Sequence, residues 1–261
     1  MRYSLLGGGK RIRPVLALAT ARALGREPED VMPLAAALEL IHTYSLIHDD
    51  LPAMDDDDLR RGQPTCHRAF GENVAILAGD GLYAEAFRLV LSEQRGDSAR
   101  VLAAVRELAA ATGVDGMVGG QFLDVAESAP PGADGLRRLH ELKTGRLIGA
   151  AVHCVVLLTD VHEPATIECY SRFASELGVL FQIVDDILDV TGTDEGLGKP
   201  QGSDERHGKR TYVSEFGLDR ARELAAESHG RACTALHRGL PPGREAPELD
   251  QITNFIFTRT S

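Results

Sequence analysis

The chain has 261 residues, with 28 Lys and Arg against 39 Asp and Glu, which gives a formal net charge of −11. Hydrophobic residues make up 43% of the chain and charged residues 26%, so the composition excludes a mainly disordered protein. The acidic balance argues against a nucleic-acid-binding protein, because such proteins present a basic surface to the phosphate backbone.

Apolar residues recur at spacings of three and four along most of the chain, which is the pattern of amphipathic helices. The predicted helices span, in chain order, 13–24, 28–48, 73–92, 98–113, 136–158, 163–190, 218–237 and 248–257. Two segments that contain Gly or Pro, 51–72 and 191–208, interrupt the pattern and are predicted to be irregular. No strands are expected. The sequence therefore predicts a single all-α domain over 1–261, built as a helix bundle.

Cysteine spacing and hydropathy indicate the cellular compartment. The four cysteines, Cys66, Cys154, Cys169 and Cys233, lack the CxxC spacing of zinc and redox sites. No hydrophobic signal segment precedes the first basic residues, and the longest apolar stretch, 148–158, is about half of what spans a bilayer. We expect a cytoplasmic protein without stable membrane insertion.

The predicted helix 28–48 runs into an aspartate-rich segment. Asp49 and Asp50 end an apolar stretch, and a proline then bends the chain so that Asp55 returns toward them. His42 lies two turns before Asp49 on the same helix face. Taken alone, this segment is compatible with a helix that ends in a solvated acidic loop.

A second aspartate-rich segment, FQIVDDILD, lies in the predicted helix 163–190. Asp185 and Asp189 are four residues apart and share one face, and Gln182 lies one turn before Asp185. The apolar neighbours make a solvated acidic face less favourable, since buried carboxylates require cations. Mg²⁺ prefers carboxylate oxygens together with substrate phosphates. Two such segments therefore favour a shared cavity that holds Mg²⁺ and a polyanionic substrate.

Basic residues beside these segments are candidates for binding phosphate. Those that lie next to glycines or next to an aspartate segment are Lys10, Arg13, Arg60, Arg61, Lys199 and Lys209. The planar guanidinium of arginine matches phosphate oxygens with two parallel hydrogen bonds. Each basic pair alone is equally compatible with an ordinary solvated surface.

Six motifs follow one another between residues 8 and 212. They are GGKRIRP, DDLPAMDDDDLRRGQPTCH, GGQFLD, LKTG, FQIVDDILD and GSDERHGKRTY. Together they resemble the motifs of trans-isoprenyl diphosphate synthases, the polyprenyl synthetase family that includes farnesyl and geranylgeranyl diphosphate synthases. The resemblance implies an all-α bundle around a deep central cavity, Mg²⁺ as cofactor, and a homodimer.

The resemblance also implies a role for each matching residue. The implied ligands of three Mg²⁺ ions are Asp49, Asp50, Asp55, Asp185, Asp186 and Asp189. The implied isopentenyl diphosphate site consists of Lys10, Arg13, His42 and Arg61. The groups that would hold the allylic diphosphate are Arg60, Lys143, Lys199 and Lys209. The oxygens of Thr144 and Gln182 would face the developing allylic cation.

The implied reaction is the Mg²⁺-dependent condensation of isopentenyl diphosphate with allylic diphosphates, dimethylallyl and geranyl, to give farnesyl diphosphate. It proceeds by ionisation to an allylic carbocation, for which metal ions and lysines neutralise the leaving diphosphate. It requires no side-chain nucleophile.

Tyr44 and Ser45 are the residues expected to set product length. Tyr44 precedes Asp49 by five residues, about 7.5 Å along a helix axis, so its ring would form the floor of the cavity. An aromatic residue there, with the longer first aspartate motif, resembles bacterial farnesyl diphosphate synthases. Tyr44 is also compatible with a core position facing a neighbouring helix, and geranylgeranyl diphosphate is the alternative product.

Two other functions are weighed against this one. The His48–Asp49 pair occurs in HD-type phosphohydrolases, which are also all-α, but such an enzyme leaves DDILD and Lys209 unexplained. A non-catalytic subunit that only binds a partner would have eroded aspartate motifs, whereas all six aspartates are present here. Members of the family usually carry another helix before GGKRIRP, which the sequence does not show; the expectation is either that the start is placed too late or that the chain lacks this helix.

Overall fold

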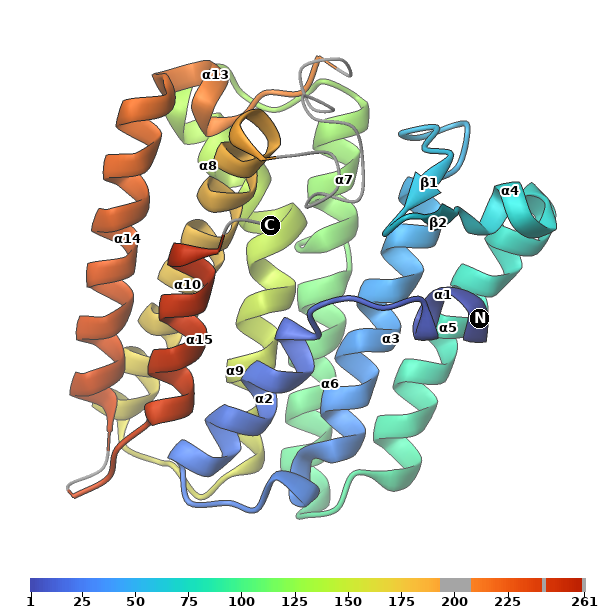
Figure 1. Ribbon diagram of the computed structural model, residues 1–261. Helices are drawn as coiled ribbons and strands as arrows, with labels where there is room; N and C mark the ends of the chain where they lie inside the picture. The colour runs from blue at the N-terminus through green and yellow to red at the C-terminus, as the bar shows by residue number, and fades with distance from the viewer. Residues whose placement is uncertain (193–207, 241–242, 260–261) are drawn as a thin grey trace.

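Most helices of the computed structural model run side by side as a bundle (Figure 1). The structure describes residues 1–192, 208–240 and 243–259. The helices are α1 Arg2–Leu6, α2 Ile12–Ala23, α3 Met32–Asp49, α4 Cys66–Phe70, α5 Glu72–Glu93, α6 Ser98–Thr112, α7 Met117–Val125, α8 Gly132–His140, α9 Arg146–Leu158, α10 Pro164–Thr191, α13 Tyr212–Phe216, α14 Leu218–Gly239 and α15 Pro247–Thr258. A 3₁₀ turn spans Pro28–Val31, a π-helical turn spans Glu141–Gly145, and two short strands are β1 Leu59–Arg60 and β2 Gln63–Pro64.

Helices α3 and α9 form the centre of the bundle. Both are apolar on almost every side, so nearly every residue of α9 between 147 and 156 is buried. Helices α2, α6 and α10 pack around α9, while α5 covers α3 and α14 covers α10. The outer helices bury one stripe each, as α5 does with Ala78, Leu82, Ala86 and Val90.

The two aspartate-rich helices end on the same side of the molecule. Both α3 and α10 run from the lower to the upper end of the bundle in the view of Figure 1. This parallel course brings the residues after Asp49 and those around Asp185 to one end, although more than 130 residues separate them in sequence. None of the described helices is long and apolar enough to cross a membrane.

The eight helices predicted from apolar periodicity are confirmed, and their ends agree within a few residues. The predicted helix 28–48 begins as the 3₁₀ turn, and the predicted helix 136–158 consists of α8 and α9 joined by the π-helical turn. The short helices α1, α4, α7 and α13 were not predicted, because five to nine residues carry too little periodicity.

The expectation of no strands is wrong in one place. Strands β1 and β2 pair antiparallel inside the segment expected to be irregular, with Arg60 opposite Gln63. The two residues between them, Arg61 and Gly62, have φ angles of 54° and 75°, as a tight hairpin turn of the mirror-image type requires. Strands of two residues are too short to show an alternating pattern in sequence. Of the second segment expected to be irregular, 193–207 lies outside the described residues.

Candidate active site

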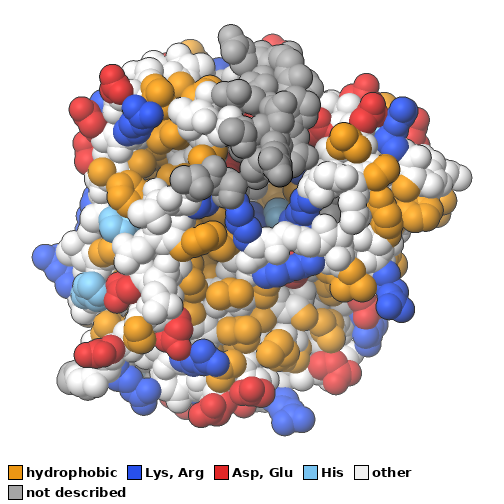
Figure 2. All heavy atoms as spheres, viewed as in Figure 1, with side chains coloured by type: hydrophobic (Ala, Val, Ile, Leu, Met, Phe, Trp, Pro, Cys, Tyr) orange, Lys and Arg blue, Asp and Glu red, His pale blue; other side chains and the backbone are white. Residues whose placement is uncertain are grey.

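A cavity of about 790 Å³ opens where α3 and α10 end. It is lined from the segment before α2, from α3, α7 and α10, from the π-helical turn, and from the residues just before α13. Of the site residues predicted from the sequence, all that the structure describes line this cavity except Asp50. Lys199 lies outside the described residues. Figure 2 shows Lys and Arg side chains gathered around a hollow on this face of the molecule.

The two aspartate segments meet in this cavity and are bridged to other parts of the chain by basic side chains. Lys209 Nζ lies 2.8 Å from an oxygen of Asp55, which connects the segment before α13 to the first aspartate segment. Arg259, after α15, lies 2.7 Å from an oxygen of Asp185. Burial raises the pKa of Asp49, whereas the charge of Lys143 lowers it. An additional cation in the cavity would stabilise the charged form of Asp49.

The donor set fits Mg²⁺ that is held jointly with a substrate. Asp49, Asp55, Asp185 and Asp189 present hard oxygen donors to the same cavity, as Mg²⁺ prefers. Over the described parts of the chain, no three acidic, His or Cys side chains are arranged to hold a metal ion by themselves. Waters and substrate phosphate oxygens commonly complete the coordination of Mg²⁺ at sites of this kind.

Asp50 occupies a different position from the other predicted ligands. Its side chain is 4% exposed, and one oxygen accepts a hydrogen bond from Arg60 Nε at 2.6 Å. It lines a small neighbouring pocket beside the β1–β2 hairpin, together with Arg60 and Arg61. Burial raises the pKa of Asp50 to about 7 even though Arg60 lowers it. In this arrangement Asp50 anchors the arginine that follows the first aspartate segment.

The π-helical turn presents Lys143 and Thr144 to the cavity. A π turn shifts the following residues relative to a regular helix, and such turns recur at functional sites. Two helices approach this turn closely through glycine. A Cβ atom on Gly120 of α7 would lie 2.2 Å from the Lys143 backbone nitrogen, and one on Gly178 of α10 would lie 2.9 Å from Gly145 Cα. Both glycines are needed for the turn to be held between α7 and α10.

We expect Gly120→Ala to destabilise the protein by about 1–3 kcal/mol and to lower its catalytic rate, because α7 would be pushed away from Lys143. Thermal unfolding and turnover measure the two effects. The matched control is Gly230→Ala in α14, where an added Cβ meets no atom within 4 Å. It should leave turnover unchanged and raise stability by roughly 0.5–1 kcal/mol. A Gly120→Ala protein with normal stability and turnover would contradict the close-packing argument.

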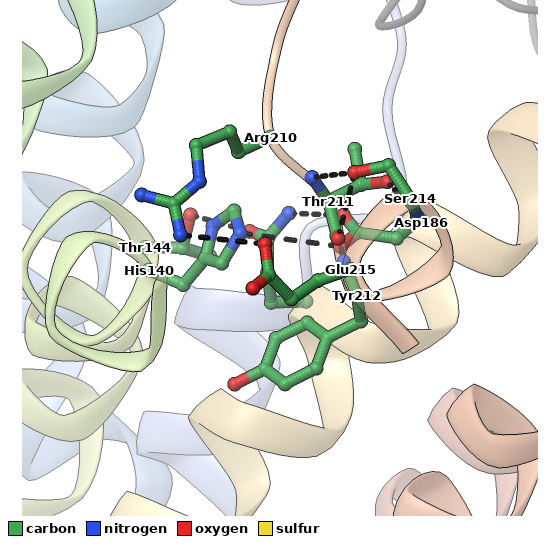
Figure 3. A network of polar contacts seen from close by, with 9 residues as sticks. His140, Thr144, Asp186, Arg210, Thr211, Tyr212, Ser214 and Glu215 are labelled. Atoms are coloured by element: carbon green, nitrogen blue, oxygen red, sulfur yellow. Dashed lines mark hydrogen bonds and ion pairs between the residues drawn. The ribbon is translucent and has the colours of Figure 1, made fainter. Parts of the chain in front are cut away.

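A chain of hydrogen bonds links the π-helical turn to α10 and to the start of α13, and Figure 3 shows it from close by. Thr144 Oγ1 donates to Gln182 Oε1 at 2.8 Å, and Gln182 Nε2 donates to Asp186 at 2.7 Å. The second oxygen of Asp186 accepts from the backbone nitrogen of Tyr212 at 2.6 Å. His140 stacks on the Tyr212 ring with centroids 5.5 Å apart. The orientation of Thr144 and Gln182 is thus fixed by Asp186, which is 1% exposed.

A further group of basic side chains lines the same cavity. Lys10, Arg13, His42 and Arg61 all line it, as predicted. Burial lowers the pKa of Arg13 to about 10, so Arg13 stays charged at neutral pH, and its Nε has no hydrogen-bond partner among the described residues. Burial and the neighbouring arginines hold the pKa of His42 well below its usual value, so His42 is neutral. A buried, charged and incompletely hydrogen-bonded arginine is suited to an anionic ligand.

Tyr44 and Ser45 both line the cavity on α3. The Tyr44 side chain faces the interior and the residue is 8% exposed, while Ser45 Oγ donates to the His42 backbone oxygen at 3.0 Å. Tyr44 also contacts α5 through the Tyr83 ring, at 4.9 Å between centroids. Tyr44 is therefore both a residue of the cavity wall and a core residue that packs against α5.

Several cavity residues were not assigned a role from the sequence. Asp124 forms an ion pair with Lys143, with 2.5 Å between Lys143 Nζ and Asp124 Oδ2. The Arg259 guanidinium stacks over the Phe181 ring, with its Cζ 4.4 Å from the ring centroid. Gln121 lines the cavity and has no hydrogen-bond partner for its amide group within the part of the chain that the structure describes. The motif GGQFLD contained the signal for Gln121 and Asp124. For Arg259 the sequence offers none, because its contact with Asp185 spans 74 residues.

Comparison with known proteins identifies the family. A family model described as polyprenyl synthetase matches residues 1–233. The chain is 48% identical to the farnesyl diphosphate synthase of Bacillus subtilis over 225 residues, 85% of this chain and 76% of that protein. It is 46% identical to the chloroplastic geranylgeranyl pyrophosphate synthase of Capsicum annuum over 265 residues, 99% of this chain and 70% of that protein.

Solved structures agree with the sequence relatives. The geranyltransferase of Helicobacter pylori, in complex with magnesium and isoprenyl diphosphate, superposes with a TM-score of 0.85 at 34% identity. The superposition covers 98% of this chain and 84% of that one. The resemblance drawn from the six motifs and the all-α fold class are both confirmed. This chain belongs to the polyprenyl synthetase family.

Proposed function

We propose that this protein condenses isopentenyl diphosphate with the allylic substrates dimethylallyl and geranyl diphosphate, and that farnesyl diphosphate is its product. The observation that carries the proposal is the meeting of both aspartate segments and two sets of basic side chains in one cavity. The names of the relatives support the same chemistry, since the Bacillus subtilis protein is a farnesyl diphosphate synthase.

We propose a separate site for each diphosphate within this cavity. Lys10, Arg13 and Arg61 line the cavity together with neutral His42 and would bind isopentenyl diphosphate. The side chains proposed to hold the allylic diphosphate are Arg60, Lys143, Lys199 and Lys209, of which Lys199 lies outside the described residues. Lys143 forms an ion pair with Asp124, and Lys209 forms one with Asp55. Both ammonium groups therefore lie beside carboxylates at this part of the cavity.

The proposed metal ligands are Asp49, Asp50, Asp55, Asp185, Asp186 and Asp189, holding three Mg²⁺ ions together with the allylic diphosphate. Members of the family use Mg²⁺. When bound, Mg²⁺ neutralises charge on the leaving diphosphate and so favours breakage of the allylic C–O bond. Asp186 is hydrogen-bonded through both oxygens and Asp50 is turned to Arg60, so Asp49, Asp55, Asp185 and Asp189 have the stronger support as direct ligands.

The protein's own groups would guide the carbocation. Thr144 and Gln182 present oxygen atoms at the cavity wall and are fixed by the hydrogen bonds to Asp186. Their dipoles would stabilise positive charge on the allylic carbons, and the enclosed apolar part of the cavity would exclude the water that quenches such a cation. Attack by the double bond of isopentenyl diphosphate then forms the new C–C bond, and a proton is lost to the released diphosphate.

Geranylgeranyl diphosphate is the second candidate product, because the relative from Capsicum annuum is named a geranylgeranyl pyrophosphate synthase. An HD-type phosphohydrolase would use His48 as a metal ligand. His48 Nε2 instead lies within hydrogen-bond distance, 3.1 Å, of the Ile76 carbonyl oxygen of α5, so this function has less support. A non-catalytic subunit has less support as well, because the aspartate segments and their basic partners are in place.

The proposal is tested by measuring diphosphate release from the purified protein. Release should require both isopentenyl diphosphate and an allylic diphosphate, and it should stop when Mg²⁺ is chelated. Release from one substrate alone would indicate hydrolysis and would contradict the proposal.

We also propose that the protein is a cytoplasmic homodimer. Large apolar side chains are exposed on the neighbouring helices α4 to α6, among them Phe70, Leu77 and Leu102, and Figure 2 shows hydrophobic side chains over α4 and the start of α5. Exposed apolar area of this kind is typical of a surface covered by a partner.

All four cysteines are free, which agrees with a reducing compartment.

We expect light scattering after size exclusion to give twice the mass of one chain. Leu77→Glu, at a position that is 69% exposed on α5, should shift the population toward the monomer. The control is Ile167→Glu on α10, which is 39% exposed and lies outside α4 to α6. A wild-type monomer at micromolar concentration would contradict the assembly.

A further inference from the structure

We propose that Tyr83 of α5 is a positioning residue for product length, which holds the Tyr44 ring across the end of the cavity. The inference rests on the proposed function, in which Tyr44 forms the cavity floor. Tyr83 does not line the cavity, and its proposed role is to keep the Tyr44 ring from moving.

Tyr44 is held between two rings. The Tyr83 ring meets it edge to face, with centroids 4.9 Å apart and planes inclined by 75°. The His48 ring meets it from one turn further along α3, at 5.7 Å and 79°. Edge-to-face pairs at these separations are attractive beyond the apolar area that they bury. Tyr44 therefore has a preferred orientation set by its neighbours.

Tyr83 lies behind Tyr44 as seen from the substrate. Tyr44 and His48 line the cavity, whereas none of the cavity-lining residues that the structure describes comes from α5. Removing the Tyr83 ring would thus leave the cavity wall itself unchanged in composition. Tyr83 is half-buried, and removing its ring would instead open space into which the Tyr44 ring could turn, since truncation of a packed side chain leaves a void that its neighbours fill only in part.

Tyr83 is itself fixed from the side of α6. Its hydroxyl lies 3.3 Å from Thr112 Oγ1. Thr112 is fully buried and donates its own hydroxyl proton to the Leu108 backbone oxygen at 2.9 Å. A hydroxyl has one proton, so Tyr83 is the donor in its contact with Thr112. The Phe87 ring supports Tyr83 from one turn further along α5, at 5.1 Å.

This arrangement connects product length to a contact between α3, α5 and α6. A growing prenyl chain presses on the Tyr44 ring, which yields only if the ring can rotate about its side-chain bonds. With Tyr83 in place, rotation would require breaking the edge-to-face contact and displacing a ring that is anchored on α6. Elongation therefore stops at the floor.

The test is the product distribution from isopentenyl and dimethylallyl diphosphates with Mg²⁺. Tyr83→Ala should raise the ratio of products longer than farnesyl diphosphate by about tenfold or more, the scale on which a pocket discriminates small apolar groups. The KM for isopentenyl diphosphate should change by less than about twofold, because its proposed site is lined from the segment before α2, from α2, α3 and the β1–β2 hairpin, and not from α5. Tyr83→Phe, which retains the ring, should restore the wild-type ratio.

The matched control is Val90→Ala, which truncates a fully buried side chain on the same helix, two turns beyond Tyr83 and away from the contact with Tyr44. It should leave the product ratio unchanged, whereas a general loosening of α5 would lengthen the product in both variants and overturn the proposal. If Tyr83→Ala does not fold, Tyr83→Leu fills most of the space without an edge-on ring and should shift the ratio in the same direction.

The outcomes separate this inference from the proposed function. A wild-type protein that yields no prenyl product would contradict the proposed function itself. Wild-type farnesyl diphosphate together with longer products from Tyr44→Ala, but an unchanged ratio in folded Tyr83→Ala, would keep the function and the floor and overturn the role of Tyr83. A wild-type product longer than farnesyl diphosphate would remove the floor and this inference with it.

Discussion

Replacement of Asp185 by Asn is expected to lower kcat roughly a thousandfold or more, because it removes a negative charge at the point where two aspartate segments would hold Mg²⁺ against the leaving diphosphate. The Asp185 side chain is 52% exposed in the cavity and forms an ion pair with Arg259. A partly exposed ion pair contributes little to stability, so the melting temperature should stay close to that of the wild type.

Two controls separate the metal from the ion pair. Arg259→Gln removes the partner of Asp185 but keeps the carboxylate, so the Mg²⁺ concentration for half-maximal rate should rise in Asp185→Asn and not in Arg259→Gln. Asp160→Asn removes an exposed aspartate paired with Arg100, away from the cavity, and should leave turnover unchanged. A folded Asp185→Asn protein with near-normal turnover would show that this carboxylate is not a metal ligand.

Replacement of Tyr44 by Ala is expected to change the main product from farnesyl diphosphate to geranylgeranyl diphosphate and longer chains. The ring lies on the cavity wall five residues before Asp49, and its removal would extend the apolar end of the cavity. A longer chain would then bury more apolar surface before release, which favours elongation.

Chromatography of the dephosphorylated products measures this change. Tyr44→Phe retains the ring and should keep farnesyl diphosphate as the product, which makes it the matched control. An unchanged product from Tyr44→Ala would place the floor of the cavity elsewhere, while the reaction itself would remain as proposed.

Local sequence was sufficient to predict the eight longer helical segments, because apolar spacing directly reflects which face of a helix is buried. The 28-residue helix α10 shows this well, since its stripe of buried residues begins at Tyr170 and reaches Asp189. The carboxylates were recognisable for a related reason. Charged residues among apolar neighbours require compensation, and this requirement can be read without knowing the partner.

Long-range contacts could not be predicted in the same way. The ion pair between Lys209 and Asp55 spans 154 residues, and the ion pair between Arg259 and Asp185 joins two helices that no motif connects. The π-helical turn at Lys143 depends on the close approach of α7 and α10, so the periodicity of 136–158 alone suggested one regular helix. The orientation of Asp50 toward Arg60 likewise depends on the hairpin that follows it.

The most direct test of the account is to identify the product formed from isopentenyl diphosphate, dimethylallyl diphosphate and Mg²⁺ by the purified protein. We expect prenyl diphosphates of which farnesyl diphosphate is the most abundant, and none when Mg²⁺ is chelated. Folded protein that forms no prenyl product from these substrates would contradict the claim that this cavity carries out the condensation.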